Sequence, residues 1–154
     1  MVAYAAGTFV FGALGSREGA SPVRLMVLGL AASALLTGIF PAVDLTGWTL
    51  SSQMWVLVPL WAANGAAQSS TWPTVVAVMA AWWPRNTRGA IFGLWAGNAM
   101  VGDVIGSIGV GWMLGAGLGW QWCFVAGSSA MALTGVALFI WLRSHPPEPA
   151  DDQD

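Results

Sequence analysis

Residues 89–142 read GAIFGLWAGNAMVGDVIGSIGVGWMLGAGLGWQWCFVAGSSAMALTGVALFIWL. Asp103 is the only charged side chain in this stretch. A membrane-spanning helix needs about 20 consecutive, mostly apolar residues, so the stretch has room for two such helices and a connection between them. The segment between Asp44 and Arg85 contains no ionisable side chain at all. The sequence therefore predicts an all-α protein that crosses a bilayer several times.

The composition excludes most soluble classes of protein. Charged residues make up 8% of the chain and hydrophobic residues 56%, whereas a typical soluble domain has about 25% charged residues. A soluble domain would need a charged surface to stay dispersed in water. The net charge is −2 and no basic patch is present, so nucleic acid is not an expected partner. The expected partner is the lipid bilayer.

The apolar runs define the organisation of the chain. We expect a transmembrane helical region over residues 1–143, with one truncated helix and about four full ones: 1–15, then 23–42, 54–83, 88–113 and 120–142. The first run lacks the basic start of a signal peptide and is shorter than a full span, so we interpret it as the second half of a helix. Residues 144–154 combine prolines with acidic residues, which predicts a disordered, hydrophilic tail.

The arginines predict the orientation. With alternating crossings, all five fall on one side of the membrane: Arg17, Arg24, Arg85, Arg88 and Arg143. Cytoplasmic loops carry the excess of Lys and Arg. The side with the arginines, and the tail after them, is therefore expected to be cytoplasmic.

A polar stripe runs along the predicted helix 54–83. Trp61, Asn64, Gln68 and Trp72 are spaced by three, four and four residues, which places them on one helix face. Buried amides in a membrane must find hydrogen-bond partners, so they either join neighbouring helices or line an aqueous cavity, and the spacing leaves both alternatives open. Pro73 cannot donate a backbone hydrogen bond, so a kink is expected where the Ser69 carbonyl loses its partner.

The next predicted helix carries a second polar face. Trp95, Asn98 and Gly102 are spaced by three and four residues, and Asp103 follows about 100° further around the helix. An ionisable side chain at membrane depth is costly, so it is a candidate functional residue. The alternative is that Asp103 is a protonated or fully hydrogen-bonded packing residue.

No catalytic constellation is present in the sequence. The only histidine, His145, lies in the predicted tail. There is no cluster of ligands with metal-binding spacing and no glycine-rich loop that would bind a nucleotide. We therefore expect no catalytic residues, no metal and no cofactor, and we do not expect an enzyme.

The block from Asn64 to Met79, which reads NGAAQSSTWPTVVAVM, is followed by Trp82-Trp83, Arg88-Gly89 and Gly93-Leu-Trp95. Together these motifs resemble the organophosphate:phosphate antiporters of the major facilitator superfamily, and most closely the eukaryotic sugar-phosphate exchanger branch. The resemblance covers nearly the whole chain. It implies helices two (in part) to six of the amino-terminal six-helix half of a twelve-helix transporter.

The resemblance also implies a binding site. Gln68 and Trp72 match cavity residues of helix four, Trp95 matches one in helix five, and Tyr4 matches one in helix two. We add Asn64 and Asn98 as candidate substrate-binding residues, because they share the polar faces described above. The candidate gating or coupling residues are Asp103 and, from the superfamily's loop motif, Arg17 and Arg24.

Two departures from the family pattern matter. Ser16 stands where the loop motif has an acidic residue, which weakens the charge-paired gating role. The family's phosphate-binding arginine is on helix one, which the register places outside this chain. Arg24 and Arg88 lie at the very start of predicted helices, and no Arg or Lys lies in the interior of one. A phosphate needs a cationic partner in a site of low dielectric constant, so we expect the chain alone not to exchange phosphate esters.

These observations predict part of a secondary transporter that exchanges phosphorylated sugars or glycerol phosphate for inorganic phosphate. The expected partners are this substrate pair and the missing helices of the full-length transporter. A non-transporting membrane fragment, or a facilitator with another small-molecule substrate, remains the alternative. The expected location is a multi-pass position in the endoplasmic reticulum or another internal membrane of a eukaryote, or in the inner membrane of a bacterium.

The topology predicts which connections a membrane-impermeant maleimide reaches. In a Cys123→Ala background, Thr87→Cys should react only from the cytoplasmic side, because its connection carries Arg85 and Arg88. Thr49→Cys should react only from the opposite side. Labelling of sealed vesicles of both orientations measures this, and modification of position 49 from the cytoplasmic side alone would overturn the topology.

Overall fold

The computed structural model describes residues 2–15, 21–44 and 47–143. Arg17 and the predicted tail over 144–154 lie outside these residues. The described residues form seven α-helices, α1 (Val2–Gly15), α2 (Pro22–Asp44), α3 (Leu50–Gln68), α4 (Thr71–Trp82), α5 (Arg85–Ala96), α6 (Asn98–Gly115) and α7 (Trp120–Trp141). The described part of the chain contains no strand, which confirms the expected all-α class.

Three helical stretches are long and apolar enough to cross a membrane: Pro22–Val43, Arg85–Gly115 and Trp120–Trp141. The apolar helix Val2–Leu14 is shorter, as expected for the truncated first helix. The predicted helix 54–83 is divided into α3 and α4. Neither helix is long and apolar enough by itself: α4 has only 12 residues, and α3 has 19 residues but includes Ser51, Ser52, Gln53, Asn64 and Gln68. The pair α3–α4 occupies the place of the remaining full span.

The junction between α3 and α4 lies at Ser69–Ser70 and follows from Pro73. Because Pro73 has no N–H group, it cannot bond to the Ser69 carbonyl. The chain tightens just before this point, where the Ser70 N–H bonds to the Ala67 carbonyl at 3.4 Å, a separation of three residues instead of four. The kink predicted at the Ser69 carbonyl is thus confirmed.

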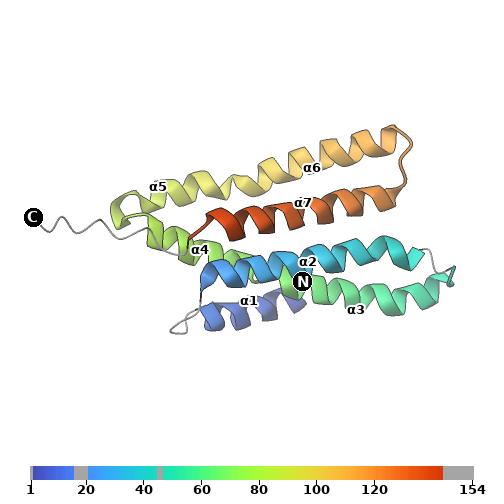
Figure 1. The fold of residues 1–154 in the computed structure, drawn as a ribbon, viewed down its shortest axis with the longest axis horizontal. Helices are drawn as coiled ribbons and strands as arrows, with labels where there is room; N and C mark the ends of the chain where they lie inside the picture. The colour runs from blue at the N-terminus through green and yellow to red at the C-terminus, as the bar shows by residue number, and fades with distance from the viewer. Residues whose placement is uncertain (1, 16–20, 45–46, 144–154) are drawn as a thin grey trace, which may run out of the picture.

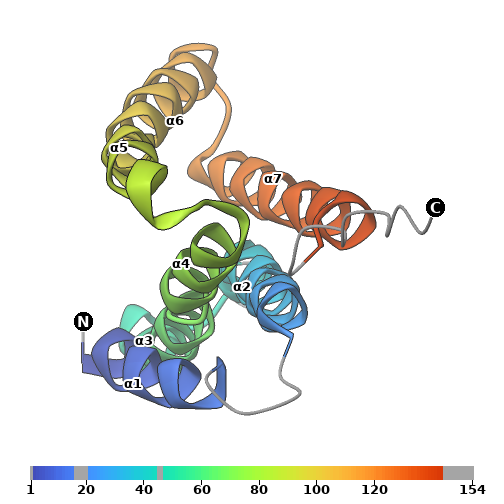
Figure 2. The same cartoon turned by 90° about the vertical axis from the view of Figure 1, so that its left-hand side faces the viewer.

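A second interruption, at Gly97, divides the predicted helix 88–113 into α5 and α6. The Gly97 N–H bonds to the Leu94 carbonyl at 3.3 Å, again a three-residue separation. Glycine weakens a helix interior because it gains no side-chain packing and loses more backbone entropy than other residues. Helix α6 lies apart from α1–α4 in both views (Figures 1 and 2), and no residue of α5 or α6 is buried.

Helix α2 is the centre of the packed part of the molecule. It packs most extensively against α7, and also against α3 and α4. Helix α1 lies on the other side of the α3–α4 pair, where it contacts both helices. Figure 2 looks along the bundle and shows α4 between α1 and α2. The junction at Ser69–Ser70 is therefore enclosed by the two neighbouring helices.

Two glycines allow this enclosure. Gly7 of α1 faces Ser69, and Gly29 of α2 faces Ser70: a Cβ atom added to either glycine would overlap the facing serine Oγ. Both serines are fully buried. Their hydroxyls donate within their own helix, from Ser69 to the Ala66 carbonyl at 2.6 Å and from Ser70 to the Ala67 carbonyl at 2.9 Å. We call this arrangement the glycine–serine clamp.

Side-chain contacts tie α2 to α3 and α7 above the clamp. The buried Ser33 hydroxyl donates to Asn64 Oδ1 at 2.6 Å and lies 3.9 Å from the sulfur of Met131. Further along, the Phe40 ring meets Trp61 edge-on at 5.3 Å and stacks on Phe124 at 5.4 Å. One serine and one phenylalanine of α2 thus connect the same three helices.

The described arginines gather at one end of the bundle. Arg24 lies in the first turn of α2, Arg85 and Arg88 begin α5, and Arg143 follows α7. These helix ends all lie at the left of Figure 1. Arg88 donates to the carbonyls of Ala80 and Trp83 at 2.6 and 3.0 Å, and so satisfies carbonyls that the end of α4 leaves without an intrahelical partner.

The clamp predicts that Gly29→Ala destabilises the fold. The new Cβ would overlap Ser70 Oγ and lie 2.9 Å from the Ala67 carbonyl oxygen, and overpacking of this kind costs about 1–3 kcal/mol. We expect the apparent melting temperature of the detergent-purified chain to fall by about 5 °C. Light scattering on heating measures it.

The matched control for Gly29→Ala is Gly93→Ala, because a Cβ at Gly93 meets no atom within 4 Å. This variant should keep or raise the melting temperature through its higher helix propensity. Adding Ser70→Ala to Gly29→Ala should restore part of the loss. Equal melting temperatures for Gly29→Ala and Gly93→Ala would show that the contact between Gly29 and Ser70 does not contribute to stability.

Candidate functional site

Two of the predicted site residues lie against each other. The indole rings of Trp72 and Trp95 have their centroids 4.7 Å apart at an interplanar angle of 44°. Trp72 lies in the first turn of α4, two residues after Ser70, and Trp95 lies in the last turn of α5, two residues before Gly97. Phe92 meets the edge of Trp95 at 6.3 Å. The two helix interruptions therefore flank one aromatic pair.

Tyr4 and Gln68 lie on neighbouring helices close to the clamp. A Cβ added to Gly65 would be 3.8 Å from the Tyr4 backbone nitrogen and 3.9 Å from its Cβ, so Tyr4 packs one helical turn from Gln68, the last residue of α3. Tyr4 is 39% exposed, and Gln68 is partly buried. Both side chains thus retain accessible surface.

Asn64 is placed differently from the other candidates. It is 3% exposed, and its Oδ1 accepts the hydrogen bond from Ser33 of α2. This is the interhelical bond that the sequence left open as one alternative for the amides of the stripe. In this structure Asn64 therefore holds α2 and α3 together, one turn from Gln68.

Asn98 and Asp103 lie on α6, where both are exposed. Asn98 is the first residue of α6, next to the interruption at Gly97 and three residues after Trp95. Asp103 lies further along α6, beyond the aromatic pair. The structure thus keeps Asn98 near the Trp72–Trp95 pair and leaves Asp103 on the unpacked part of the chain.

Arg24 is exposed in the first turn of α2, where its backbone N–H bonds to Ser21 Oγ at 3.4 Å. The first turn of α2 lies at the arginine end of the bundle (Figure 1). Arg17, the other gating candidate, lies outside the described residues. No described residues group into a cluster that could hold a metal ion.

The chemistry of this region is that of a polar binding surface. It offers a phenol, an amide and two indoles, which donate and accept hydrogen bonds and provide flat apolar walls. Positive charge is absent from the described parts of the spans and begins only at their arginine end. The arrangement can hold and orient a polar solute, but it has no nucleophile and base in contact.

Sequence reasoning missed Ser33, Ser69 and Ser70, which are fully buried. Ser33 is the partner of Asn64, and the two others form the clamp. A usable signal was the proximity of Ser69 and Ser70 to Pro73, because small hydroxyl residues commonly satisfy the carbonyls that a proline leaves without a partner.

The contact between Trp72 and Trp95 predicts energetic coupling between them. Trp72→Leu and Trp95→Leu should each lower the apparent melting temperature, and the double variant should lose less than the sum. An aromatic pair contributes about 0.5–1.5 kcal/mol beyond its buried area, and residues in contact give non-additive effects. Thermal unfolding of the four proteins in detergent measures the coupling.

A second double-mutant cycle, which combines Trp72→Leu with Trp141→Leu, serves as the control. Trp141 is 79% exposed at the end of α7, so these two effects should add. Additive effects for Trp72 and Trp95 as well would contradict the contact.

Comparison with known proteins places the chain in a family. Residues 1–154 match the family model of the Major Facilitator Superfamily. Over 148 residues, or 96% of the chain, it is 34% identical to "Sugar phosphate exchanger 3" of Homo sapiens. It is 32% identical, over its full length, to "Glucose-6-phosphate exchanger SLC37A2" of Homo sapiens.

A plant protein, "Putative glycerol-3-phosphate transporter 2" of Arabidopsis thaliana, is 28% identical over 98% of the chain. The matched regions cover 29%, 32% and 29% of these three relatives, so the chain spans about a third of their length. No solved structure matches the chain. With a family match along its whole length and three helices able to cross a bilayer, the chain is an integral membrane protein that belongs to the Major Facilitator Superfamily.

Proposed function

We propose that the chain supplies helices two (in part) to six of the amino-terminal half of a secondary transporter. This transporter exchanges a phosphorylated sugar or glycerol phosphate for inorganic phosphate, without chemical change to either. The observation that carries the proposal is the 34% identity to a sugar phosphate exchanger over 96% of the chain. The neighbouring positions of Tyr4, Gln68, Trp72 and Trp95 support it.

In this proposal Gln68 and Tyr4 hydrogen-bond the oxygens of the substrate, and the Trp72–Trp95 pair forms an apolar wall against the sugar or glycerol carbons. Asn98, three residues from Trp95, extends the polar surface. Asn64 acts as a positioning residue, because its bond to Ser33 at 2.6 Å fixes the helix face that carries Gln68.

The negative charge of the phosphate requires a cationic group that the candidate site lacks. A phosphate dianion in a site of low dielectric constant needs a cationic partner, and the described spans carry arginine only in the first turns of α2 and α5. We therefore assign the cation to another helix of the full-length transporter. This helix and the second half of the transporter are the protein partners that the proposal requires.

Transport then proceeds by alternating access around a site near the middle of the membrane. The interruptions at Ser69–Ser70 and Gly97 are the points where α3–α4 and α5–α6 can bend, and both adjoin the aromatic pair. We assign the arginine end to the cytoplasm, with Arg17, Arg24 and Asp103 as the candidate gating or coupling residues. The proposed location is an internal membrane such as the endoplasmic reticulum in a eukaryote, or the bacterial inner membrane.

The proposal predicts the activity of a chimera. Residues 1–154 would replace the matched segment of the human sugar phosphate exchanger 3, and the purified chimera would be reconstituted in liposomes loaded with phosphate. We expect uptake of labelled glucose 6-phosphate or glycerol 3-phosphate that depends on internal phosphate. Gln68→Ala should lower this uptake at least tenfold, because the substrate loses a hydrogen-bonding partner, whereas Gly93→Ala should leave it unchanged.

The chain alone, reconstituted in the same way, should give no uptake above empty liposomes. Uptake by the chain alone, lost on Gln68→Ala, would show that it needs no helix from elsewhere. A folded chimera that carries unphosphorylated glucose and ignores internal phosphate would reject phosphate exchange.

A further inference from the structure

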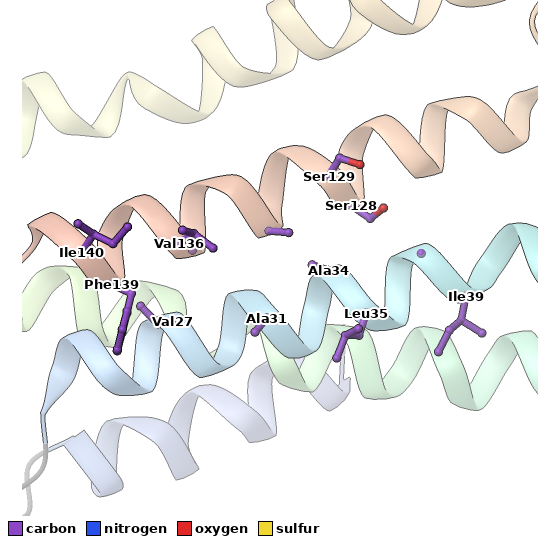
Figure 3. A pocket seen from close by; sticks show the side chains of 13 residues that line it. Val27, Ala31, Ala34, Leu35, Ile39, Ser128, Ser129, Val136, Phe139 and Ile140 are labelled. Atoms are coloured by element: carbon purple, nitrogen blue, oxygen red, sulfur yellow. The ribbon is translucent and has the colours of Figure 1, made fainter.

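A groove of about 990 Å³ runs between α2 and α7. Val27, Ala31 and Leu35 line it from α2, and Ala132, Val136 and Phe139 line it from α7. Figure 3 shows Val27 and Phe139 close together toward one end of the groove and Ile39 and Ser128 toward the other. None of the predicted site residues borders it.

The walls of the groove are apolar. Its only polar side chains are Ser128 and Ser129, and both hydroxyls donate to the Val125 carbonyl of their own helix, at 3.0 and 2.7 Å. They are therefore already satisfied and need no donor or acceptor from a ligand. A chain of methylene groups suits such walls better than any polar solute.

The groove opens away from the candidate substrate site. Val27 and Ala31 each lie two residues from Gly29, which is about 200° around the helix. Gly29 faces Ser70, so the groove side of α2 is opposite the side that packs on the α3–α4 pair. In a membrane protein an apolar outward face of this kind meets lipid.

One end of the groove is basic. Arg24 lies three residues before Val27, on the same face of α2, and Arg143 lies three residues after Ile140 of α7. Both arginines are exposed. The Arg143 carbonyl accepts a hydrogen bond from Trp82 Nε1 at 2.9 Å, which fixes the backbone at this end of α7. Each helix that forms the groove thus carries an exposed arginine within three residues of the groove lining at this end.

The length of the groove fits one leaflet. At about 1.5 Å per residue, the stretch from Val27 to Ile39 is about 18 Å long. Half of a hydrocarbon core of about 30 Å is about 15 Å. An acyl chain that enters at the arginine end would therefore lie along the groove to the middle of the bilayer.

We propose that the α2–α7 groove binds an anionic phospholipid, with its phosphate at Arg24 and Arg143 and an acyl chain between the two helices. Basic sites between membrane helices attract anionic head groups, and the apolar walls select a lipid over a free phosphate. The lipid would hold α7 against α2 from the outside. This site is independent of the proposed transport function.

The test measures lipid retained by the purified chain in nanodiscs of phosphatidylcholine with a minor fraction of phosphatidylglycerol, by native mass spectrometry. Arg24→Gln and Arg143→Gln should each lower the phosphatidylglycerol affinity about fivefold. Arg85→Gln removes an arginine from the same end but away from the groove and should leave the affinity unchanged. Ala31→Phe fills the groove and should lower retention of both lipids at least tenfold.

Competition separates a lipid from a free anion. Lysophosphatidylglycerol with a sixteen-carbon chain should displace the bound lipid, whereas inorganic phosphate should not. Equal losses for Arg85→Gln and Arg24→Gln, displacement by phosphate, or full retention in folded Ala31→Phe would each overturn the proposal. So would a dimer that holds no lipid and dissociates on Ala31→Phe, because a second copy would then occupy the groove.

Discussion

The backbone N–H that Pro73 lacks is the constraint on which the arrangement of helices depends. Without it the Ser69 carbonyl has no intrahelical partner, and lipid offers no water to replace the bond. Hydroxyl groups bond the carbonyls on both sides of the junction: Ser69 and Ser70 bond those of Ala66 and Ala67, and Thr74 bonds those of Ser70 and Thr71 at 2.7 and 2.9 Å. All three hydroxyl residues are almost completely buried. Only glycine leaves room for helices to approach so closely. Gly7 must therefore lie opposite Ser69 and Gly29 opposite Ser70, which fixes how α1 and α2 are placed along the α3–α4 pair.

The same constraint positions the candidate site. Because Gly7 is held at Ser69, Tyr4 lies one turn away beside Gly65, and Gln68 precedes the clamp directly. Trp72 lies in the first turn of α4, just after the clamp, and meets Trp95 from α5. The residues proposed to bind substrate are thus the nearest neighbours of the junction. A change in the bend at Ser69–Ser70 would move Trp72 relative to Tyr4 and Gln68, so local structure and proposed alternating access share one set of residues.

Much of the fold could be predicted from the sequence, because length, hydropathy and charge spacing act locally. Helices α2 and α7 begin and end close to the expected residues, and Pro73 indicated the junction. The partner of Asn64 could not be predicted: Ser33 is distant in sequence, and only packing selects it over the other hydroxyls. The interruption at Gly97 was also missed, since glycines recur throughout that helix and nothing local distinguishes one of them. The α2–α7 groove depends on two helix faces whose pairing no single helix reveals. The contact of Trp72 with Trp95 agrees with their expected faces, while their binding role stays a prediction.

The helices must associate without the hydrophobic effect that drives packing in soluble proteins. Apolar side chains gain little from leaving lipid for a helix interface, so close packing and interhelical hydrogen bonds carry the association. Where the chain supplies such contacts, at the glycine–serine clamp and at Ser33–Asn64, helices α1 to α4 pack closely. Helix α6 has glycines that meet no neighbour within 4 Å, such as Gly102 and Gly106, and it stands apart from α1–α4 (Figure 2). Small residues alone therefore do not assemble the bundle. They need a facing group that fits against them, which α1 and α2 find in the serines of the junction and α6 does not find within the described part of this chain.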